Sequence, residues 1–130
     1  MLTSATYSEF GWPLHVTPAT RPRTLQNFPM QANGAEKMRL AAIAATETGL
    51  DVGCPVHDGF VLCAPAGRIE ADVAVMRECM RQATLAFTRG LEVRVDCQIV
   101  RHPHRYCDKR GIDMWNRILG LRDALGRIAA

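Results

Sequence analysis

The residues of this chain best suited to chemistry lie in a short polar step between two apolar stretches. His57 and Asp58 follow the stretch from Leu50 to Val56 and precede the stretch from Phe60 to Ala64. Two short apolar stretches around a tight polar turn predict a β-hairpin. A carboxylate at such a strand end, held by a rigid sheet, can bind Mg²⁺ with little reorganisation. An ordinary turn, in which Asp58 supplies only turn geometry, explains the same residues and is the commoner case.

A second group of polar side chains lies just before and at the start of a predicted helix. The group comprises Arg23, Asn27 and Gln31, and the helix is expected to start near Met30. Asn27 is placed to cap or precede that helix, and Pro29 would lie near its first turn. Arginine, asparagine and glutamine side chains there could bind phosphate, sugar or base edges. Helix capping plus a solvated arginine would explain the same residues without a ligand.

Taken together, the two groups resemble the C-terminal part of the polymerase domain of family A DNA polymerases. In that family an arginine precedes an Asn-x-Pro-x-Gln-Gly-x-Ala-Ala-Asp/Glu segment, a helix follows, and a hairpin then carries Val-His-Asp-Glu, the last polymerase motif. This chain has Arg23, then Asn27-Phe-Pro-Met-Gln31-Ala-Asn-Gly-Ala-Glu, an Ala-rich run, and Pro55-Val-His57-Asp58. Order and spacing both match. The resemblance runs from about Phe10 to Leu121, and Asp108-x-x-Gly-x-x-Met-Trp is similar to a plasmid- or phage-type branch.

The resemblance implies a role for each matching residue. Asp58 corresponds to the second metal-binding catalytic aspartate of the palm subdomain, and His57 to the histidine that contacts the primer end. Arg23, Asn27 and Gln31 correspond to residues that touch the primer-template, largely from the minor-groove side. The implied reaction is template-directed nucleotidyl transfer from deoxynucleoside triphosphates to a primer 3′-hydroxyl, with two Mg²⁺ ions as cofactors.

Several departures from the family pattern bear on activity. Gly59 stands where the family usually has a glutamate, and Ala32 and Asn33 stand where it has Gly-Thr. The first catalytic aspartate and the fingers helix that holds the incoming nucleotide have no counterpart in this chain. The chain is therefore expected to be inactive by itself and to need an upstream polymerase half. The alternatives are a non-catalytic module that keeps the palm fold and binds DNA or a protein, and a stable fragment of such a polymerase with no activity.

The hydrophobic pattern predicts the elements that would position these residues. Ala5–Phe10 and Leu14–Thr17 predict a hairpin, and an Ala-rich run to about Thr48 predicts a helix that Gly49 ends. Leu91–Val100 alternates as a half-buried strand does. Two amphipathic helices are predicted from apolar residues at intervals of three or four, the first at Ile69, Val73, Met76, Met80, Ala83 and Phe87, the second at Met114, Ile118, Leu121, Leu125 and Ile128.

These elements predict an α+β fold. A small antiparallel sheet would include the hairpin with His57 and Asp58, and helices would pack on one face of it. A length of 130 residues, with 48% apolar residues, fits a single domain over 1–130. Because earlier palm strands would be missing, an edge of the sheet would stay uncovered, and self-association through that edge is expected.

Composition limits the remaining classes of function. The net charge of +3 permits nucleic-acid binding without indicating it. No apolar stretch approaches the length that spans a bilayer, and residues 1–10 do not form a signal peptide, so no membrane association and a cytoplasmic location are expected.

The five cysteines include no Cys-x-x-Cys pair. Cys63, Cys79 and Cys97 lie among apolar neighbours and are predicted to be buried and reduced. His102, His104 and Cys107 could contribute to a zinc site. Since no second cluster of matching spacing exists, a solvated connector with Tyr106 packed is the preferred interpretation, with Trp115 in the core.

Overall fold

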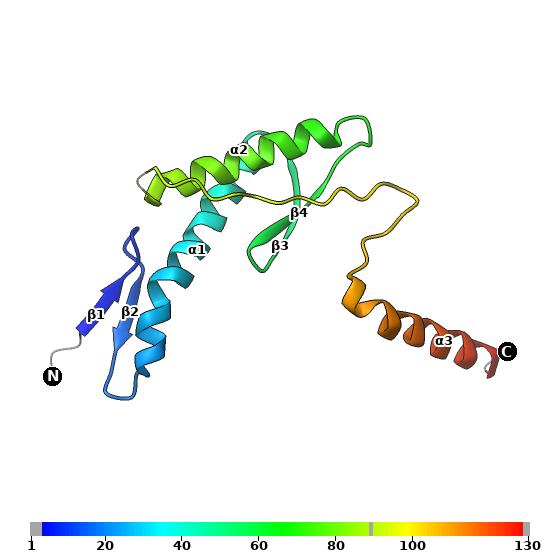
Figure 1. Ribbon diagram of the computed structural model, residues 1–130, viewed down its shortest axis with the longest axis horizontal. Coiled ribbons are helices and arrows are strands. Elements are labelled where there is room, and N and C mark those ends of the chain that lie inside the picture. Colours follow the sequence, from blue (N-terminus) through cyan, green and yellow to red (C-terminus); the bar gives the residue numbers. More distant parts are fainter. Residues whose placement is uncertain (1–3, 89, 129–130) are drawn as a thin grey trace. The chain divides into compact units, whose positions relative to one another are not determined.

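The computed structural model describes residues 4–88 and 90–128. The chain divides into two compact units, Met1–Cys97 and Gln98–Ala130. This division describes where the chain is compact and does not test whether residues 1–130 form one domain, so the single domain stays a prediction. The first unit contains β1 (Ser4–Tyr7), β2 (Pro13–Val16), α1 (Pro22–Glu47), β3 (Asp51–Val56), β4 (Gly59–Cys63) and α2 (Ile69–Thr88) (Figure 1). The second contains a 3₁₀ turn at Lys109–Gly111 and α3 (Ile112–Ile128).

The predicted α+β class is confirmed, with both expected hairpins present. Strands β1 and β2 pair antiparallel, and β3 and β4 pair antiparallel in a second sheet of two strands. The prediction of a third strand at Leu91–Val100 is wrong, because this segment has no regular secondary structure. Alternating apolar and polar residues suit a half-buried strand. A strand also needs a neighbouring strand whose backbone forms hydrogen bonds with its N–H and C=O groups. No other strand in residues 4–88 or 90–128 pairs with this segment.

Helix α1 begins about two turns earlier than expected. Pro22 occupies its first position, where the missing proline N–H removes no helical hydrogen bond, and Arg21 before it is extended. The helix then continues through Pro29, which lies inside it. The prediction that Asn27 caps the helix and that Pro29 lies in its first turn is therefore wrong. Pro22 and Pro29 both suit the first turn of a helix, and the expectation from the sequence placed Pro29 there.

The end of α1 is set by Gly49, as predicted. Its φ of +81° lies in the left-handed region, where glycine has no steric penalty. The Gly49 N–H donates to the Thr46 carbonyl over 3.0 Å, and the Leu50 N–H donates to the Ala45 carbonyl over 3.1 Å. This pair of bonds is the Schellman motif. It turns the chain directly into β3, and Leu50 is buried beside the helix that it leaves.

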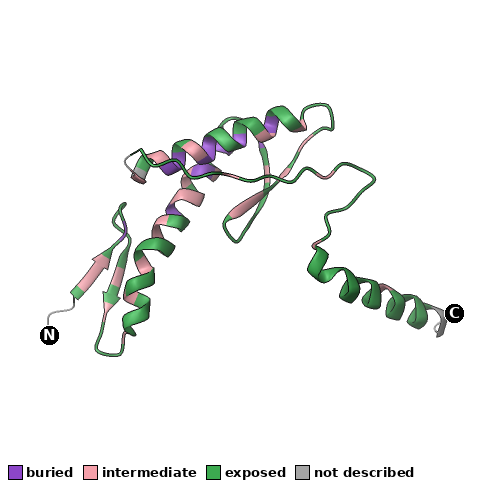
Figure 2. Ribbon diagram, viewed as in Figure 1, coloured by how far each residue is buried: buried purple, intermediate pink, exposed green. Residues whose placement is uncertain are grey.

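The core lies between α1 and α2. Figure 2 shows the buried residues concentrated on these two helices. Small side chains of α1 meet larger ones of α2, and the buried apolar set is Ala41, Ala45, Leu50, Met76, Cys79, Met80 and Ala83. The predicted face of α2 is thus confirmed at Met76, Met80 and Ala83, whereas the side chain of Phe87 lies outside the described residues.

Four predicted burials are wrong. Cys63 and Cys97 are exposed, and only Cys79 of the three cysteines is buried. Tyr106 is 68% exposed and Trp115 is 52% exposed. An apolar local sequence favours burial only where another element covers it. Cys63 ends an edge strand, and Cys97 lies in the segment that forms no strand.

A buried carboxylate fastens the β1–β2 hairpin to α1. Glu36 is 3% exposed and accepts a 2.5 Å hydrogen bond from the Ser8 hydroxyl. Its second oxygen accepts from the Phe10 N–H over 3.3 Å. The Ser8 hydroxyl oxygen in turn accepts from the Trp12 N–H over 3.0 Å. The Arg39 guanidinium lies 5.9 Å from the centre of the Trp12 ring, a cation–π distance.

Removal of this carboxylate is expected to destabilise the first unit. In Glu36→Ala the Ser8 hydroxyl and the Phe10 N–H lose their acceptor while part-buried, which costs about 1–3 kcal/mol. Urea unfolding followed by circular dichroism measures the loss. Glu47→Ala, which truncates an exposed glutamate of the same helix, is the matched control and should change stability by less than about 0.5 kcal/mol. Equal effects of the two variants would contradict a specific role for Glu36.

Candidate functional site

The β3–β4 hairpin presents His57 and Asp58 at its tip. Val56 pairs with Gly59, so these two residues alone form the turn. His57 has a φ of +52°, a left-handed conformation that side chains other than glycine adopt at some steric expense. A register shift between Val52 and Cys54 marks a β-bulge at Gly53. A Cβ on Gly53 would lie 3.3 Å from the Val61 carbonyl oxygen, which explains the glycine.

Asp58 stands by itself at this tip. Both His57 and Asp58 are exposed, and neither side chain forms a hydrogen bond or ion pair with another described residue. Within residues 4–88 and 90–128, no three His, Cys, Asp or Glu side chains gather closely enough to hold a metal ion. Mg²⁺ retains most of its water and prefers several anionic oxygens around it. One exposed carboxylate therefore does not make a Mg²⁺ site within the part of the chain that the structure describes.

Arg23, Asn27 and Gln31 lie on one stripe of α1. Because α1 begins at Pro22, all three belong to the helix, four residues apart. This spacing places them within about 80° around the helix and over about 12 Å along it. All three are exposed, and their side chains have no hydrogen-bond or ion-pair partner in the described part of the chain. The stripe is a row of donors available to a ligand.

The structure brings together the members of each group. His57 and Asp58 share one turn, and Arg23, Asn27 and Gln31 share one helix face. No hydrogen bond or ion pair between described residues connects the turn with the stripe. The two groups are linked through the chain itself, because α1 leads through Gly49 into β3.

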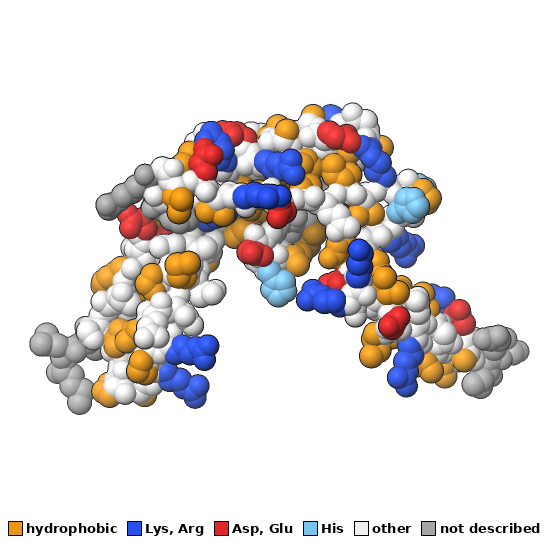
Figure 3. Space-filling view, viewed as in Figure 1, with side chains coloured by type: hydrophobic (Ala, Val, Ile, Leu, Met, Phe, Trp, Pro, Cys, Tyr) orange, Lys and Arg blue, Asp and Glu red, His pale blue; other side chains and the backbone are white. Residues whose placement is uncertain are grey.

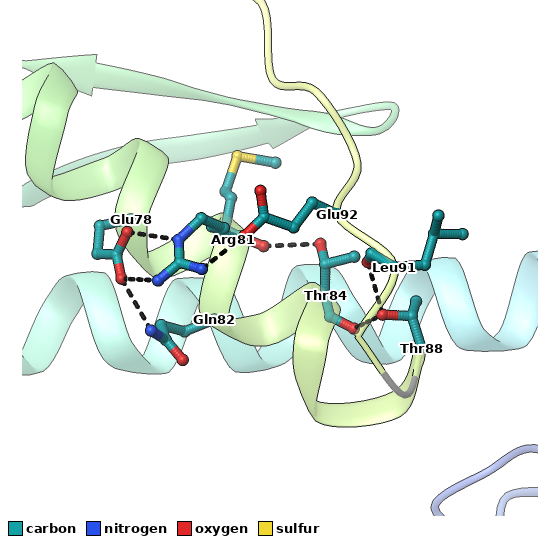
Figure 4. A network of polar contacts seen from close by, with 8 residues as sticks. Glu78, Arg81, Gln82, Thr84, Thr88, Leu91 and Glu92 are labelled. Carbon is teal, nitrogen blue, oxygen red and sulfur yellow. Dashed lines mark hydrogen bonds and ion pairs between the residues drawn. The ribbon is translucent and has the colours of Figure 1, made fainter.

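Sequence reasoning missed an ion-pair network on α2 (Figure 4). The Arg81 guanidinium donates to both Glu78 oxygens over 2.7 and 2.8 Å and to Glu92 over 2.7 Å. The Thr88 hydroxyl lies 2.7 Å from the Leu91 carbonyl oxygen. These contacts hold the chain after α2 against the helix. The ion pair of Glu78 and Arg81 could have been predicted, because the two residues are three apart on a helix. The contact with Glu92 could not, because Glu92 lies beyond the end of the helix.

The network sets the protonation of Glu78. The hydrogen bonds from Arg81, then from Gln82, lower the pKa of Glu78 from 4.5 to about 2. Glu78 and Glu92 in return raise the pKa of Arg81. In the second unit, hydrogen bonds from the Arg110 side chain and backbone lower the pKa of Asp108 to about 2.

This shift predicts a pH dependence in strong acid. The folded-state pKa of Glu78 lies below its ordinary value, so the contribution of the pair to stability is complete above about pH 4.5 and is lost as the pH falls toward about 2. Carboxyl ¹³C NMR titration should give a Glu78 midpoint near 2. Arg81→Gln should return the midpoint toward 4.5. Arg77→Gln, the same change on the same helix, should leave it in place; an unchanged midpoint in Arg81→Gln would contradict the assignment.

The connector with His102, His104 and Cys107 forms no metal site in the structure, since the described residues contain no cluster of three suitable ligands. None of the described helices combines the length and apolar character needed to cross a bilayer.

No protein-family model, no curated protein and no solved structure matched this chain.

Proposed function

We propose that this chain is the C-terminal palm part of a family A DNA-directed DNA polymerase. The observation that supports this most is the stripe of Arg23, Asn27 and Gln31 on α1. It presents three unpartnered polar side chains on the helix that leads into the hairpin bearing His57 and Asp58. The sequence motifs of the family have this same order.

The stripe suits contact with a primer-template duplex. The minor groove presents hydrogen-bond acceptors at similar positions for all base pairs, so arginine and glutamine donors can bind there without reading sequence. Arg23 also suits a phosphate oxygen, to which a guanidinium can donate two hydrogen bonds. A rigid helix holds these groups in a fixed row, which favours one register of the duplex.

The tip of the hairpin would lie at the primer end. His57 would contact the primer terminus, and Asp58 would supply one carboxylate for Mg²⁺ in the complete polymerase. The remaining ligands, the first catalytic aspartate and the site for deoxynucleoside triphosphates would come from an upstream polymerase half. By itself the chain would bind DNA without catalysing nucleotidyl transfer. We assign it to the cytoplasm, and we expect an uncovered sheet edge to support a homo-oligomer when the upstream half is missing.

Fluorescence anisotropy of labelled DNA tests the stripe. The chain should bind a recessed primer-template junction more tightly than a blunt duplex at low salt. Arg23→Ala combined with Gln31→Ala should weaken junction binding by about tenfold or more and remove the preference, because each such contact contributes about 1–3 kcal/mol. Arg77→Ala with Gln82→Ala removes the same side-chain types from α2 and should retain the preference. Equal binding by wild type and the α1 double variant would disprove the role of the stripe.

A non-catalytic module is the second candidate. It is favoured by the setting of Asp58, which among the described residues belongs to no group of three His, Cys, Asp or Glu side chains that could hold a metal. Under this alternative the chain keeps the palm fold and binds DNA or a protein through α1. Asp58→Ala would then leave its function intact, whereas a polymerase would lose its activity.

A further inference from the structure

The segment after α2 has the properties of a strand without a partner. Arg94 and Asp96, two residues apart, form an ion pair of 3.0 Å, as side chains on one side of an extended backbone can. They are 89% and 84% exposed, while Val95 between them is half-buried against the α1–α2 core. Among the described residues, no hydrogen bond engages the backbone N–H and C=O groups of residues 92–97. Such a row of open backbone groups readily pairs with another strand.

The first half of this segment is fixed to the molecule. Glu92 is held by Arg81 at 2.7 Å, and the Leu91 carbonyl oxygen lies 2.7 Å from the Thr88 hydroxyl. Val95 packs against the core cluster. An anchored extended segment loses less conformational entropy on pairing than a loose one. The segment is therefore an extended stretch whose backbone groups can pair with a strand.

We propose that residues 91–99 form the interface of a homodimer, in which the segments of two copies pair antiparallel about Val95. This proposal does not depend on the polymerase function. In this register Arg94 lies opposite Asp96 of the second copy, and Asp96 lies opposite Arg94 of that copy. Apolar residues also oppose one another, since Val93 meets Cys97 and Leu91 meets Ile99. Two-fold pairing makes every such contact occur twice.

Charge selects this register over its neighbours. A parallel in-register pair would place Arg94 against Arg94 and Asp96 against Asp96, which is unfavourable. An antiparallel pair centred on Arg94 would also oppose like charges. Centring on Val93 would pair Arg94 with Glu92, but Glu92 is already bound to Arg81. In the register about Val95, the Arg94–Asp96 ion pair within each chain is replaced by an Arg94–Asp96 ion pair between chains. Two ion pairs are lost and two are formed.

A second surface could also hold two copies together and must be distinguished. Figure 3 shows hydrophobic side chains on the surface of α3. Met114, Ile118, Leu121 and Leu125 are exposed there. Charged residues of both signs flank this stripe, namely Asp113, Arg117, Arg122 and Asp123, and Arg122 forms an ion pair with Asp123 over 2.7 Å. Charge therefore does not exclude α3, and substitutions confined to residues 94 and 96 distinguish the two surfaces.

Sedimentation equilibrium of the full chain tests the proposal. Wild type should show a concentration-dependent monomer–dimer equilibrium. Arg94→Asp alone, or Asp96→Arg alone, should raise the dissociation constant on the order of tenfold or more, because like charges then oppose each other twice. Combining Arg94→Asp with Asp96→Arg should restore the dimer to within about threefold of wild type. Mixing the double variant with wild type should give no mixed dimers, since each mixed pair opposes like charges.

Two controls test for a general effect of charge and for loss of folding. Arg77→Asp, a charge reversal on exposed α2, should leave the dissociation constant unchanged, and circular dichroism should show native helix content in all variants. The four substituted forms differ only at exposed positions, so loss of folding is not expected. A monomer at all concentrations would overturn the proposal. So would a dimer that both single variants leave intact, which would point to α3, or a double variant that fails to recover.

Discussion

The Asp58→Asn substitution is expected to reduce nucleotidyl transfer on the order of 10³-fold once the chain completes a polymerase. Asparagine keeps the size of aspartate and its suitability for a turn, so the β3–β4 hairpin should persist. It removes the negative charge, and Mg²⁺ binds carboxylate oxygens far better than amide oxygens. This expectation depends on the proposed polymerase function.

A chimaera provides the assay. The chain would replace the corresponding C-terminal palm segment of an active family A polymerase, and single-nucleotide primer extension would be measured. Asp51→Asn is the matched control, because Asp51 is an exposed aspartate at the other end of the same hairpin. It should retain activity within about threefold. An active chimaera in which Asp58→Asn is silent would reject the catalytic role and favour the binding module.

Met80→Ala is expected to destabilise the first unit by about 2–5 kcal/mol. Met80 is buried in the cluster that joins α1 to α2, beside a helix face whose buried residues are the small side chains Ala41 and Ala45. Since the buried apolar set is small, few neighbours can move in to fill the space that Met80 leaves. A loss of this size is a large share of the stability of an ordinary small domain.

Urea unfolding measures this loss as a lower midpoint. Val75→Ala, on the exposed side of α2, is the control and should lower the stability by less than about 1 kcal/mol. The reverse experiment, Ala45→Leu, should also destabilise by about 1–3 kcal/mol, because Ala45 is fully buried and the added atoms of leucine would have to displace core neighbours. If Met80→Ala and Val75→Ala had equal effects, the α1–α2 contact would not be the core.

Features governed by neighbouring residues could be predicted from the sequence. The period of apolar residues predicted α2 and α3, and short stretches on either side of turn residues predicted both hairpins. Gly49 ends α1 because its left-handed conformation suits glycine, which is a local property. The turn at His57 and Asp58 was likewise predicted from the two residues that separate apolar stretches.

The candidate site was predicted in part. The turn bearing Asp58 was expected, but the common stripe of Arg23, Asn27 and Gln31 was not, because the helix was expected to start after Asn27. Once α1 begins at Pro22, their spacing of four residues places them on one face. A proline suits a first turn at either Pro22 or Pro29, so the local signal did not distinguish the two.

The sequence by itself determined that α1, α2 and α3 form, where the hairpins turn, and which polar residues stand at the tip of β3–β4. Only the tertiary structure decided what lies against those elements. Residues 91–99 have the alternation of a strand but no described strand beside them, and Cys63, Tyr106 and Trp115 are apolar or aromatic yet exposed. Glu36 is charged yet buried, because Ser8 and Phe10 from a distant hairpin donate to it. Burial and strand pairing depend on contacts between segments far apart in the chain, and a local pattern does not contain them.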